Sequence, residues 1–314
     1  MVYRGSKAGF ALARSTVLRG KAGSDERFGS ALGTGDLDRD GIADLVVGAD
    51  GPGFPDDEGF SGPGSVSACY GGSSGVRSCT QLVHDLKYAG NQSLVVGNVS
   101  GDARPEIVFG VPDTFLQFGS TTAEKKGRRG GAVEVLTLTG TGSATTVKTI
   151  ELTQDSSGVR GTDEAGDQFG ASVALGDLDR DSYADLVVGA PGEDVGSHED
   201  AGRVTVVYGA AKGYRKSGGK VYDQGTKGVP GKPEYRDGFG GAVALLDHDG
   251  DGRVDLDVGA PGEDVSTEDG YKGAVTTLRG SGKSFTTKRS RTFTLKTLGY
   301  TQVGNEDFGR VLGR

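Results

Sequence analysis

The dipeptide Phe-Gly recurs along this chain, and its repetition constrains the fold more than any other feature of the sequence. The copies at Phe28, Phe169, Phe239 and Phe308 mark one recurring point of the repeat. The last three are separated by 70 and 69 residues, and the first two by 141, which is close to two periods. A copy that lacks the dipeptide is visible at 93–98, which aligns with 172–177. The chain is therefore a series of equivalent units.

Each unit reads as four strands. In the clearest unit an alternating segment at 171–175 is followed by an acidic loop and by apolar runs at 184–191 and 203–209, and a weaker fourth segment closes the unit. Short Val-rich runs bounded by Gly, Pro and Asp are typical of strands, and no helical period is sustained. Gly supplies 58 of the 314 residues, which suits many tight turns. We expect an all-β chain of four-stranded β-propeller blades; a linear β-solenoid usually has shorter repeats.

The repeat divides the chain into about four and a half blades. The expected units are 1–20 (remnant of a preceding blade), 21–86, 87–155, 156–224, 225–297 and 298–314 (start of a truncated blade). The segment 2–5 matches a third strand, a fourth strand is expected near 15–18, and 308–313 reads as a first strand. Pairing these ends would leave a blade without its second strand, so a piece of a larger propeller is the simpler interpretation.

Three units carry the same acidic loop between their first two strands. Carboxylates stand at loop positions 1, 3, 5 and 9: Asp36, Asp38, Asp40 and Asp44; Asp177, Asp179, Asp181 and Asp185; Asp247, Asp249, Asp251 and Asp255. Four carboxylates this close repel one another unless a cation lies among them. Oxygen ligands without His or Cys select a hard cation, and this flexible, ligand-rich loop favours Ca²⁺ over Mg²⁺. The backbone carbonyls at position 7, of Ile42, Tyr183 and Arg253, are expected to complete the shell.

These loops differ from an EF-hand, which needs Glu at position 12 and flanking helices, because position 12 here is a strand valine. The threefold recurrence disfavours a merely solvated acidic turn. The loop of unit 87–155 is degenerate, with Asn98, Ser100, Asp102 and Glu106 at the four positions. Because it has only two charges, we expect weak or absent metal binding there and about three calcium sites in the whole chain.

Cys69 and Cys79 flank the turn-like segment 71–75, so they are expected on neighbouring strands of a hairpin. Either a disulfide or two free thiols fits this placement, and the hairpin geometry favours the disulfide. A bridge would place the protein outside a reducing cytosol. The first five residues lack the layout of a signal peptide, and no apolar run is long enough to span a membrane.

The order of these motifs resembles the FG-GAP repeat of integrin α-subunit propellers and of related secreted bacterial proteins. Phe-Gly is followed by Asp-x-Asp-x-Asp-Gly-x-x-Asp and then by Gly-Ala-Pro at 189–191 and 259–261. The segments 48–50 and 110–112 are imperfect versions of Gly-Ala-Pro. The resemblance implies a seven-bladed propeller with calcium loops on a lower face. It also implies that the loops after the second strands lie on an upper face that meets partners.

The same sequence argues against several functions. The net charge of −8 is unsuited to a nucleic-acid binder. The segment 71–75 fits a nucleophile-elbow pattern but lies in a predicted hairpin, and 280–284 lacks the first glycine of a phosphate loop. We therefore expect a non-catalytic, extracellular or cell-surface module that binds calcium. Its partner is expected to be a protein, extracellular-matrix or cell-surface ligand. The alternative is the propeller portion of a larger secreted hydrolase, such as a lipase.

Charge on the upper-face loops suggests where a partner would dock. The acidic members are Asp56, Asp57, Glu58, Glu193, Asp194, Glu199, Asp200, Glu263, Asp264, Glu268 and Asp269, and the basic members are Lys125, Lys126, Arg128 and Arg129. Opposite charges on one rim can steer a charged partner. Two alternatives remain: solvated loops that keep the protein soluble, or Gly-Glu-Asp segments that cap turns beside the strand ends.

Overall fold

The computed structural model describes most of the chain, and within the described part every regular element is a β-strand. The described residues are 2–6, 9–20, 27–50, 64–86, 93–102, 104–112, 130–140, 145–211, 213–264, 272–300 and 307–313. Sixteen of the strands form four sheets, and each sheet has four strands. The all-β prediction is confirmed.

Each of the four sheets is an antiparallel meander. The strands of the first sheet are β3 (Arg27–Gly35), β4 (Asp44–Asp50), β5 (Gly64–Tyr70) and β6 (Ser78–Leu86). Those of the second are β7 (Leu94–Gly97), β8 (Glu106–Val111), β9 (Ala132–Thr139) and β10 (Thr146–Leu152). Those of the third are β11 (Ser172–Gly176), β12 (Asp185–Ala190), β13 (Arg203–Val207) and β16 (Lys220–Tyr222). Those of the fourth are β17 (Ala242–Leu246), β18 (Asp255–Ala260), β19 (Ala274–Gly280) and β20 (Phe285–Phe293).

Two smaller pairings complete the described strands. They are β1 (Val2–Ser6) with β2 (Gly9–Thr16), and β14 (Gly209–Ala210) with β15 (Gly213–Tyr214). The strand expected near 15–18 therefore begins earlier than the sequence suggested. The first strand expected at 308–313 is wrong: in the described segment 307–313, Phe308 forms one isolated bridge with Gly273 and no strand follows. A strand needs a partner along its length, and the described part of the chain gives this segment only that bridge.

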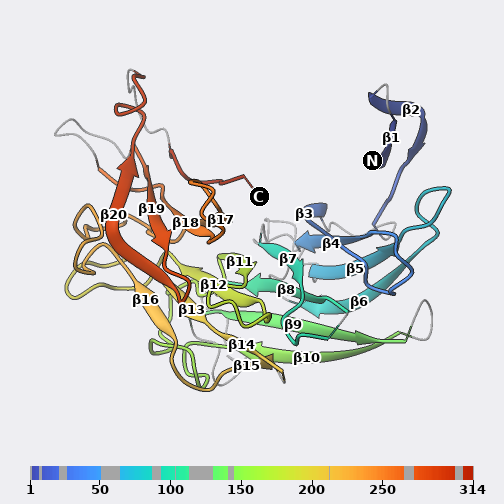
Figure 1. The fold of residues 1–314 in the computed structure, drawn as a ribbon, viewed down its shortest axis with the longest axis horizontal. Helices are drawn as coiled ribbons and strands as arrows, with labels where there is room; N and C mark the ends of the chain where they lie inside the picture. Colours follow the sequence, from blue (N-terminus) through green and yellow to red (C-terminus); the bar gives the residue numbers. More distant parts are fainter. Residues whose placement is uncertain are drawn as a thin grey trace, which may run out of the picture.

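The four sheets are arranged as propeller blades. Their first strands, β3, β7, β11 and β17, contact one another in that order and lie on the inner side of an arc, whereas the fourth strands lie outside (Figure 1). Each sheet packs face to face on the next. No strand pairing between the first and fourth sheets closes the described arc into a ring.

The hydrophobic core is divided among the spaces between neighbouring blades. One cluster joins the first and second sheets, one the second and third, and one the third and fourth. The second strands β8, β12 and β18 are buried along their whole length, because both faces of each sheet are covered. This explains why the interiors of β8 and β12 read as continuous apolar runs instead of alternating ones, whereas β18 carries the buried Asp257 within its run.

The Phe-Gly dipeptide fastens each blade to its neighbours. The side chain of Phe239 is fully buried in the cluster between the third and fourth blades, and its N–H donates to the carbonyl of Ala201 in the third blade at 3.0 Å. The N–H of Gly240 donates at 2.9 Å to the carbonyl of Gly259, the first residue of Gly-Ala-Pro in its own blade. A Cβ on Gly189 would overlap the carbonyl of Gly240. Glycine is therefore required where the two motifs of adjacent blades meet.

Candidate metal centres

The three complete acidic loops lie at equivalent places, between the first and second strands of their blades. They connect β3 to β4, β11 to β12 and β17 to β18. Each loop contains left-handed backbone at positions 4 or 6, as at Arg39 (φ 64°) and Gly41 (φ 81°). In the middle loop Ser182 takes the place of that glycine and still adopts φ 74°. The middle loop therefore has the same left-handed turn, although the Ser182 side chain makes this backbone conformation less favourable than glycine would.

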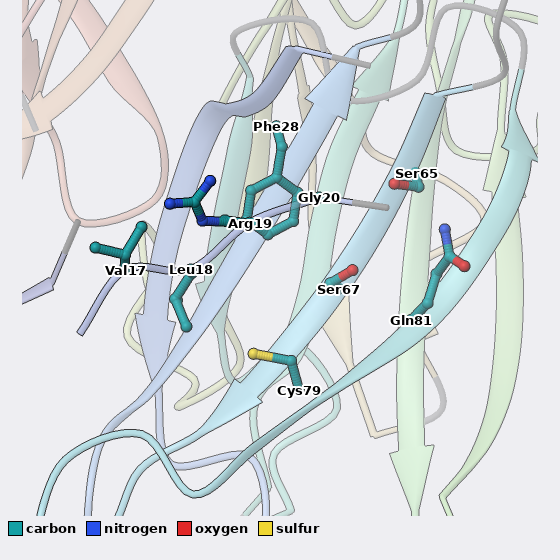
Figure 2. Close-up of a pocket in the computed structure, with 9 residues that line it drawn as sticks. All are labelled: Val17, Leu18, Arg19, Gly20, Phe28, Ser65, Ser67, Cys79 and Gln81. Carbon is teal, nitrogen blue, oxygen red and sulfur yellow. The ribbon is translucent and has the colours of Figure 1, made fainter. Parts of the chain in front are cut away.

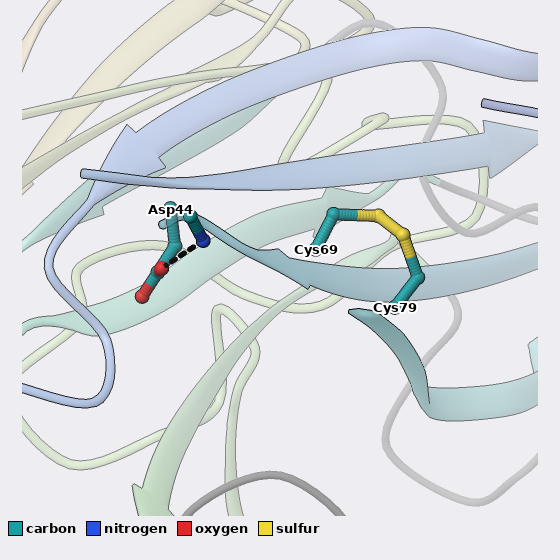
Figure 3. Close-up of a disulfide and its surroundings, with 4 residues drawn as sticks. Asp44, Cys69 and Cys79 are labelled. Atoms are coloured by element: carbon teal, nitrogen blue, oxygen red, sulfur yellow. Dashed lines mark hydrogen bonds between the residues drawn. A yellow bond between two sulfur atoms is a disulfide. The ribbon is translucent and has the colours of Figure 1, made fainter. Parts of the chain in front are cut away.

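The carboxylates at positions 1 and 9 are held by the backbone of their own blade. Asp36 accepts the N–H groups of Asp40 and Gly41 at 3.1 and 2.9 Å. Asp44 accepts those of Leu37 and Gly71, both at 2.7 Å, and so joins the loop to the end of the third strand (Figure 3). The other two loops repeat these bonds.

The position 9 carboxylates are almost completely buried, at 1, 0 and 2% exposure for Asp44, Asp185 and Asp255. Burial raises the pKa of Asp44, and it raises that of Asp185 to about 6, against the lowering effect of the two N–H donors on Asp185. The raised pKa of Asp44 and Asp185 means that a negative charge on these two side chains is undercompensated, and a nearby cation would supply the missing charge.

In each loop three carboxylates converge, with one ligand atom of each lying within 4.8 Å of the others. The groups are Asp36, Asp38 and Asp40; Asp177, Asp179 and Asp185; and Asp247, Asp249 and Asp251. The fourth predicted ligands, Asp44, Asp181 and Asp255, lie outside these groups. The carbonyl ligation predicted for Ile42, Tyr183 and Arg253 stays a prediction, and the N–H groups of these residues donate to the position 5 carboxylates.

Two oxygen atoms in these groups show that the loops fit a cation. Asp38 Oδ1 and Asp179 Oδ1 are both buried and accept no hydrogen bond. The Asp38 side chain is 9% exposed. A buried polar atom without a partner is costly, and a hard dication among the three carboxylates would satisfy it. The residue types and their placement therefore suit Ca²⁺, the ion that the spacing predicts.

The degenerate loop between β7 and β8 uses its oxygen atoms internally. Glu106, at position 9, accepts the N–H groups of Val99 at 2.8 Å and Ser100 at 3.2 Å, and also the Ser100 hydroxyl at 2.7 Å. Asp102 accepts the N–H of Arg104 at 2.8 Å. Glu106 thus accepts loop N–H groups as the position 9 aspartates do in the complete loops. Weak or absent metal binding at Asn98, Ser100, Asp102 and Glu106 stays a prediction.

An arginine pairs with the acidic groups of each complete loop, which the sequence analysis missed. Arg77 lies 2.8 Å from Asp38 and 2.9 Å from Asp40. Arg215 pairs with the corresponding Asp179 and Asp181, and Arg279 pairs with Asp249. A sequence signal exists for the first two, because Arg77 and Arg215 each stand seven residues after the tyrosine that ends or follows the third strand.

The glutamates of the Gly-Glu-Asp segments are not displayed on a rim, which corrects the expectation of an acidic upper face at these positions. Glu193 and Glu263 are 6 and 9% exposed, and they accept hydrogen bonds from Gln154 and Gln224 of the preceding blades. The two glutamates therefore stabilise turns, whereas Asp194, Glu199 and Asp264 are exposed and Asp200 is half-buried, so the docking role of these loops stays a prediction. The residues 56–58, 125–129 and 268–269 lie outside the described chain.

Cys69 and Cys79 form a disulfide between opposite positions of β5 and β6, as the hairpin geometry favoured (Figure 3).

Close to this disulfide, a cavity of about 290 Å³ separates the segment 17–20 from the face of the first sheet (Figure 2). Its described lining includes Phe28 and Cys79 and contains no histidine and no carboxylate. Nothing in this cavity indicates acid–base or metal-assisted catalysis.

Comparison with known proteins identifies the class of repeat. The FG-GAP repeat profile matches residues 28–68 and 169–207, which include two of the three complete acidic loops. The chain thus contains FG-GAP repeats at these two segments and is related in sequence to integrin α-subunits and to phosphatidylinositol-glycan-specific phospholipase D.

Three relatives illustrate the relationship. Integrin alpha pat-2 of Caenorhabditis briggsae is 29% identical over 78% of this chain and 19% of its own length. Human integrin alpha-IIb is 32% identical over 54% of this chain and 14% of its own length. Human phosphatidylinositol-glycan-specific phospholipase D is 38% identical over 36% of this chain and 13% of its own length. The chain therefore spans less than a fifth of each of these relatives.

Among solved structures, rhamnogalacturonan lyase YesW superposes with a TM-score of 0.42 at 16% identity, over 72% of this chain and 39% of that chain. A likeness this distant supports no statement about function.

In the part of the chain that is described, no helix is long and apolar enough to cross a membrane. The disulfide and the relationship to integrin α-subunits favour an extracellular location.

Proposed function

We propose that this chain is a calcium-binding, non-catalytic propeller module that acts outside the cell in adhesion or protein binding. The observation that carries the proposal is the convergence of three carboxylates in each of three equivalent loops, with buried, unpartnered oxygens at Asp38 and Asp179. Calcium bound there would join the loop to the strands on either side of it. The blades would then present a rigid surface to a partner.

The relationship to integrin α-subunits supports the adhesion part of this proposal, because integrin alpha pat-2 aligns over 78% of the chain. The non-catalytic part is an expectation from the sequence, in which neither 71–75 nor 280–284 fits the catalytic or phosphate-binding motif it resembles. The ligand is expected to be a protein or an extracellular-matrix or cell-surface component, with neither nucleic-acid binding nor membrane insertion.

Titration calorimetry tests the calcium sites directly. The wild-type chain should bind about three Ca²⁺, one in each complete loop. Asp38→Asn and Asp179→Asn remove the charge that faces each binding position, so each variant should bind about one ion fewer.

Asp102→Asn is the matched control, because it makes the same change in the degenerate loop and should leave the stoichiometry unaltered. A well-folded wild-type sample that binds no calcium would contradict the proposal. So would equal losses in all three variants.

A second candidate is the propeller portion of a larger secreted hydrolase. One observation favours it: human phosphatidylinositol-glycan-specific phospholipase D is 38% identical to this chain over 117 residues. The coding sequence on either side of the chain separates the two candidates. A contiguous hydrolase domain would support the second, and further propeller blades followed by an adhesion-receptor architecture would support the first.

A further inference from the structure

Arg77 occupies a defined place beside the first acidic loop. It lies in the turn between β5 and β6, where its N–H donates to the carbonyl of Tyr70 at 2.8 Å. Its guanidinium reaches across to Oδ2 of Asp38 and Oδ2 of Asp40, at 2.8 and 2.9 Å. The missing side chain of Gly72 leaves room for the Arg77 stem, because a Cβ there would lie 2.6 Å from Arg77 Cγ. The arginine is therefore held in place by the turn that carries it.

The third blade repeats this construction. The N–H of Arg215 donates to the carbonyl of Tyr208 at 2.8 Å, and the guanidinium lies 5.3 Å from the centre of the Tyr208 ring. It pairs with Oδ2 of Asp179 at 2.7 Å and with Oδ2 of Asp181. Each arginine thus bridges loop positions 3 and 5 through the same oxygens.

The fourth blade reaches the same result from another position. Arg279 directly precedes Gly280, whose N–H donates to the position 9 carboxylate Asp255, as Gly71 and Gly209 do in their own blades. Arg279 therefore stands where the other two blades have their tyrosine, yet it pairs with position 3 of its loop, Asp249. In all three blades a guanidinium therefore pairs with the position 3 carboxylate, although the arginine comes from two different places in the chain. This recurrence indicates that the acidic loop itself needs a cationic partner.

The arginines leave the inner oxygens of these carboxylates uncovered. Asp38 Oδ1 and Asp179 Oδ1 are buried without a hydrogen-bond partner, whereas the Oδ2 atoms of the same groups face arginine. Guanidinium and calcium can therefore contact one carboxylate on different oxygens. Without calcium, the guanidinium reduces the repulsion among the four carboxylates; with calcium, it adds repulsion between two cations.

We propose that Arg77, Arg215 and Arg279 are resident counter-cations of the calcium loops: each stabilises its loop when calcium is absent and lowers the affinity of that loop for calcium. This inference rests on the proposed calcium function. It predicts that the arginines set how strongly the stability of the chain depends on calcium. Removing the arginines should make the calcium-free chain less stable. It should also increase the stability that the chain gains when calcium binds.

The test combines Arg77→Gln with Arg215→Gln in the full chain, because Gln keeps much of the stem and one donor group while removing the charge. Calorimetric titration with calcium should show affinity that is tighter by roughly two- to fivefold, the effect expected of one partly exposed charge at each site. Thermal unfolding in a calcium chelator should begin at a lower temperature than for the wild type. The gap between melting temperatures with and without calcium should widen.

Arg39→Asn is the matched control. Arg39 lies in the first loop at φ 64°, a conformation that Asn tolerates, and the substitution removes one positive charge that contacts none of the loop carboxylates. It should change affinity and calcium-free stability less than Arg77→Gln does. Arg77→Lys, which keeps the charge, should behave more like the wild type than like Arg77→Gln.

Three outcomes would overturn the proposal. Weaker calcium binding in the arginine variants would mean that the arginines organise the site for calcium. Unchanged affinity and unchanged stability in chelator would mean that the ion pairs are incidental. Equal effects from Arg39→Asn would mean that any positive charge near the loop changes affinity and stability in this way, whether or not it pairs with a carboxylate. The chelator measurement needs no bound calcium, so it tests the arginines even if the wild-type chain binds none.

Discussion

Glu263 and Asp237 form a buried acidic pair between the third and fourth blades. They are 9 and 1% exposed. Burial, opposed by the hydrogen bond from Gln224 and reinforced by the charges of Asp237, Glu234 and Asp264, raises the pKa of Glu263 to about 7. Burial likewise raises the pKa of Asp237 to about 6, where the nearby His198 acts in the opposite direction.

The preceding blade shows how the same glutamate can be neutralised. Glu193 is bound by Gln154, as Glu263 is bound by Gln224, and it also pairs with Arg203. Arg203 stands opposite Ala190 in the strand ladder, and the equivalent place opposite Ala260 is taken by Ala274. At this place the described part of the fourth blade has no arginine, and a proton can neutralise Glu263 instead.

A pH prediction follows for Glu263. Because its pKa is higher in the folded chain than the ordinary 4.5, the folded state binds more protons between about pH 4.5 and 7, and stability falls as pH rises through that window. Glu263→Gln removes this dependence. The stability of the variant relative to the wild type should therefore rise by on the order of 2 kcal/mol between pH 5.5 and pH 8.

Thermal unfolding at the two pH values, in the same excess of calcium, measures the difference. The exposed Glu199→Gln is the control, since that side chain is solvated in both states. A stability difference between wild type and Glu263→Gln that is the same at both pH values would show that the buried carboxylate is neutralised in another way.

At the residue scale, the sequence predicted what depends on local spacing and missed what depends on neighbouring strands. The Asp-x-Asp-x-Asp loops could be located because all their ligands lie within nine residues. The pairing of Arg77 with Asp38 joins residues 39 apart, so the pattern of the acidic loop alone does not show it. The burial of Glu193 depends on Gln154 in another blade, which is why it was assigned to an exposed rim.

The next scale is the contact between structural elements, where the Phe-Gly and Gly-Ala-Pro motifs meet. The backbone of one blade approaches that of the next so closely at Gly189 and Gly259 that any side chain would overlap a carbonyl, that of Gly240 or of Gly309. Rigid backbone atoms on both sides leave little freedom to relax. Glycine is thus retained for close approach between sheets, in addition to its conformational freedom.

Gly189→Ala should therefore separate or tilt the third and fourth blades. We expect a loss of about 2–3 kcal/mol in the free energy of unfolding, the usual cost of overpacking a tight contact, measured by chemical denaturation in calcium. Gly97→Ala is the control, because the added Cβ would meet only the movable end of Leu175, at 2.9 Å. If both variants lose the same stability, the close approach at Gly189 does not limit blade packing.

The elements themselves were largely predictable, because each blade repeats one order of strands and turns. The fully buried β8 and β12 carry runs of apolar residues that no helix period explains. Prediction failed at 308–313, where the apolar pattern of a first strand is present but the described chain supplies a single bridge to Phe308. A strand pattern specifies a strand only when a partner is in place.

At the scale of the whole molecule, stability is distributed over contacts between neighbouring blades. Each of the three clusters lies between two sheets, so every inner blade is held on both of its faces. The acidic loops add a second kind of link, because each position 9 carboxylate binds its own loop to the end of the third strand. The repeat period predicted the blades and their order, whereas closure of a ring depends on contacts that a period does not encode.

The central claim, that these blades are held by calcium, is tested most directly by the melting temperature of the chain in excess calcium and in excess chelator. Three sites occupied at 100 times their dissociation constants would each add about 2.7 kcal/mol, so calcium should raise the melting temperature by roughly 10 °C or more. The triple variant Asp38→Asn, Asp179→Asn and Asp249→Asn, which changes one carboxylate in each group, should lose most of this increase. A folded wild-type chain that melts at the same temperature in calcium and in chelator would contradict the account.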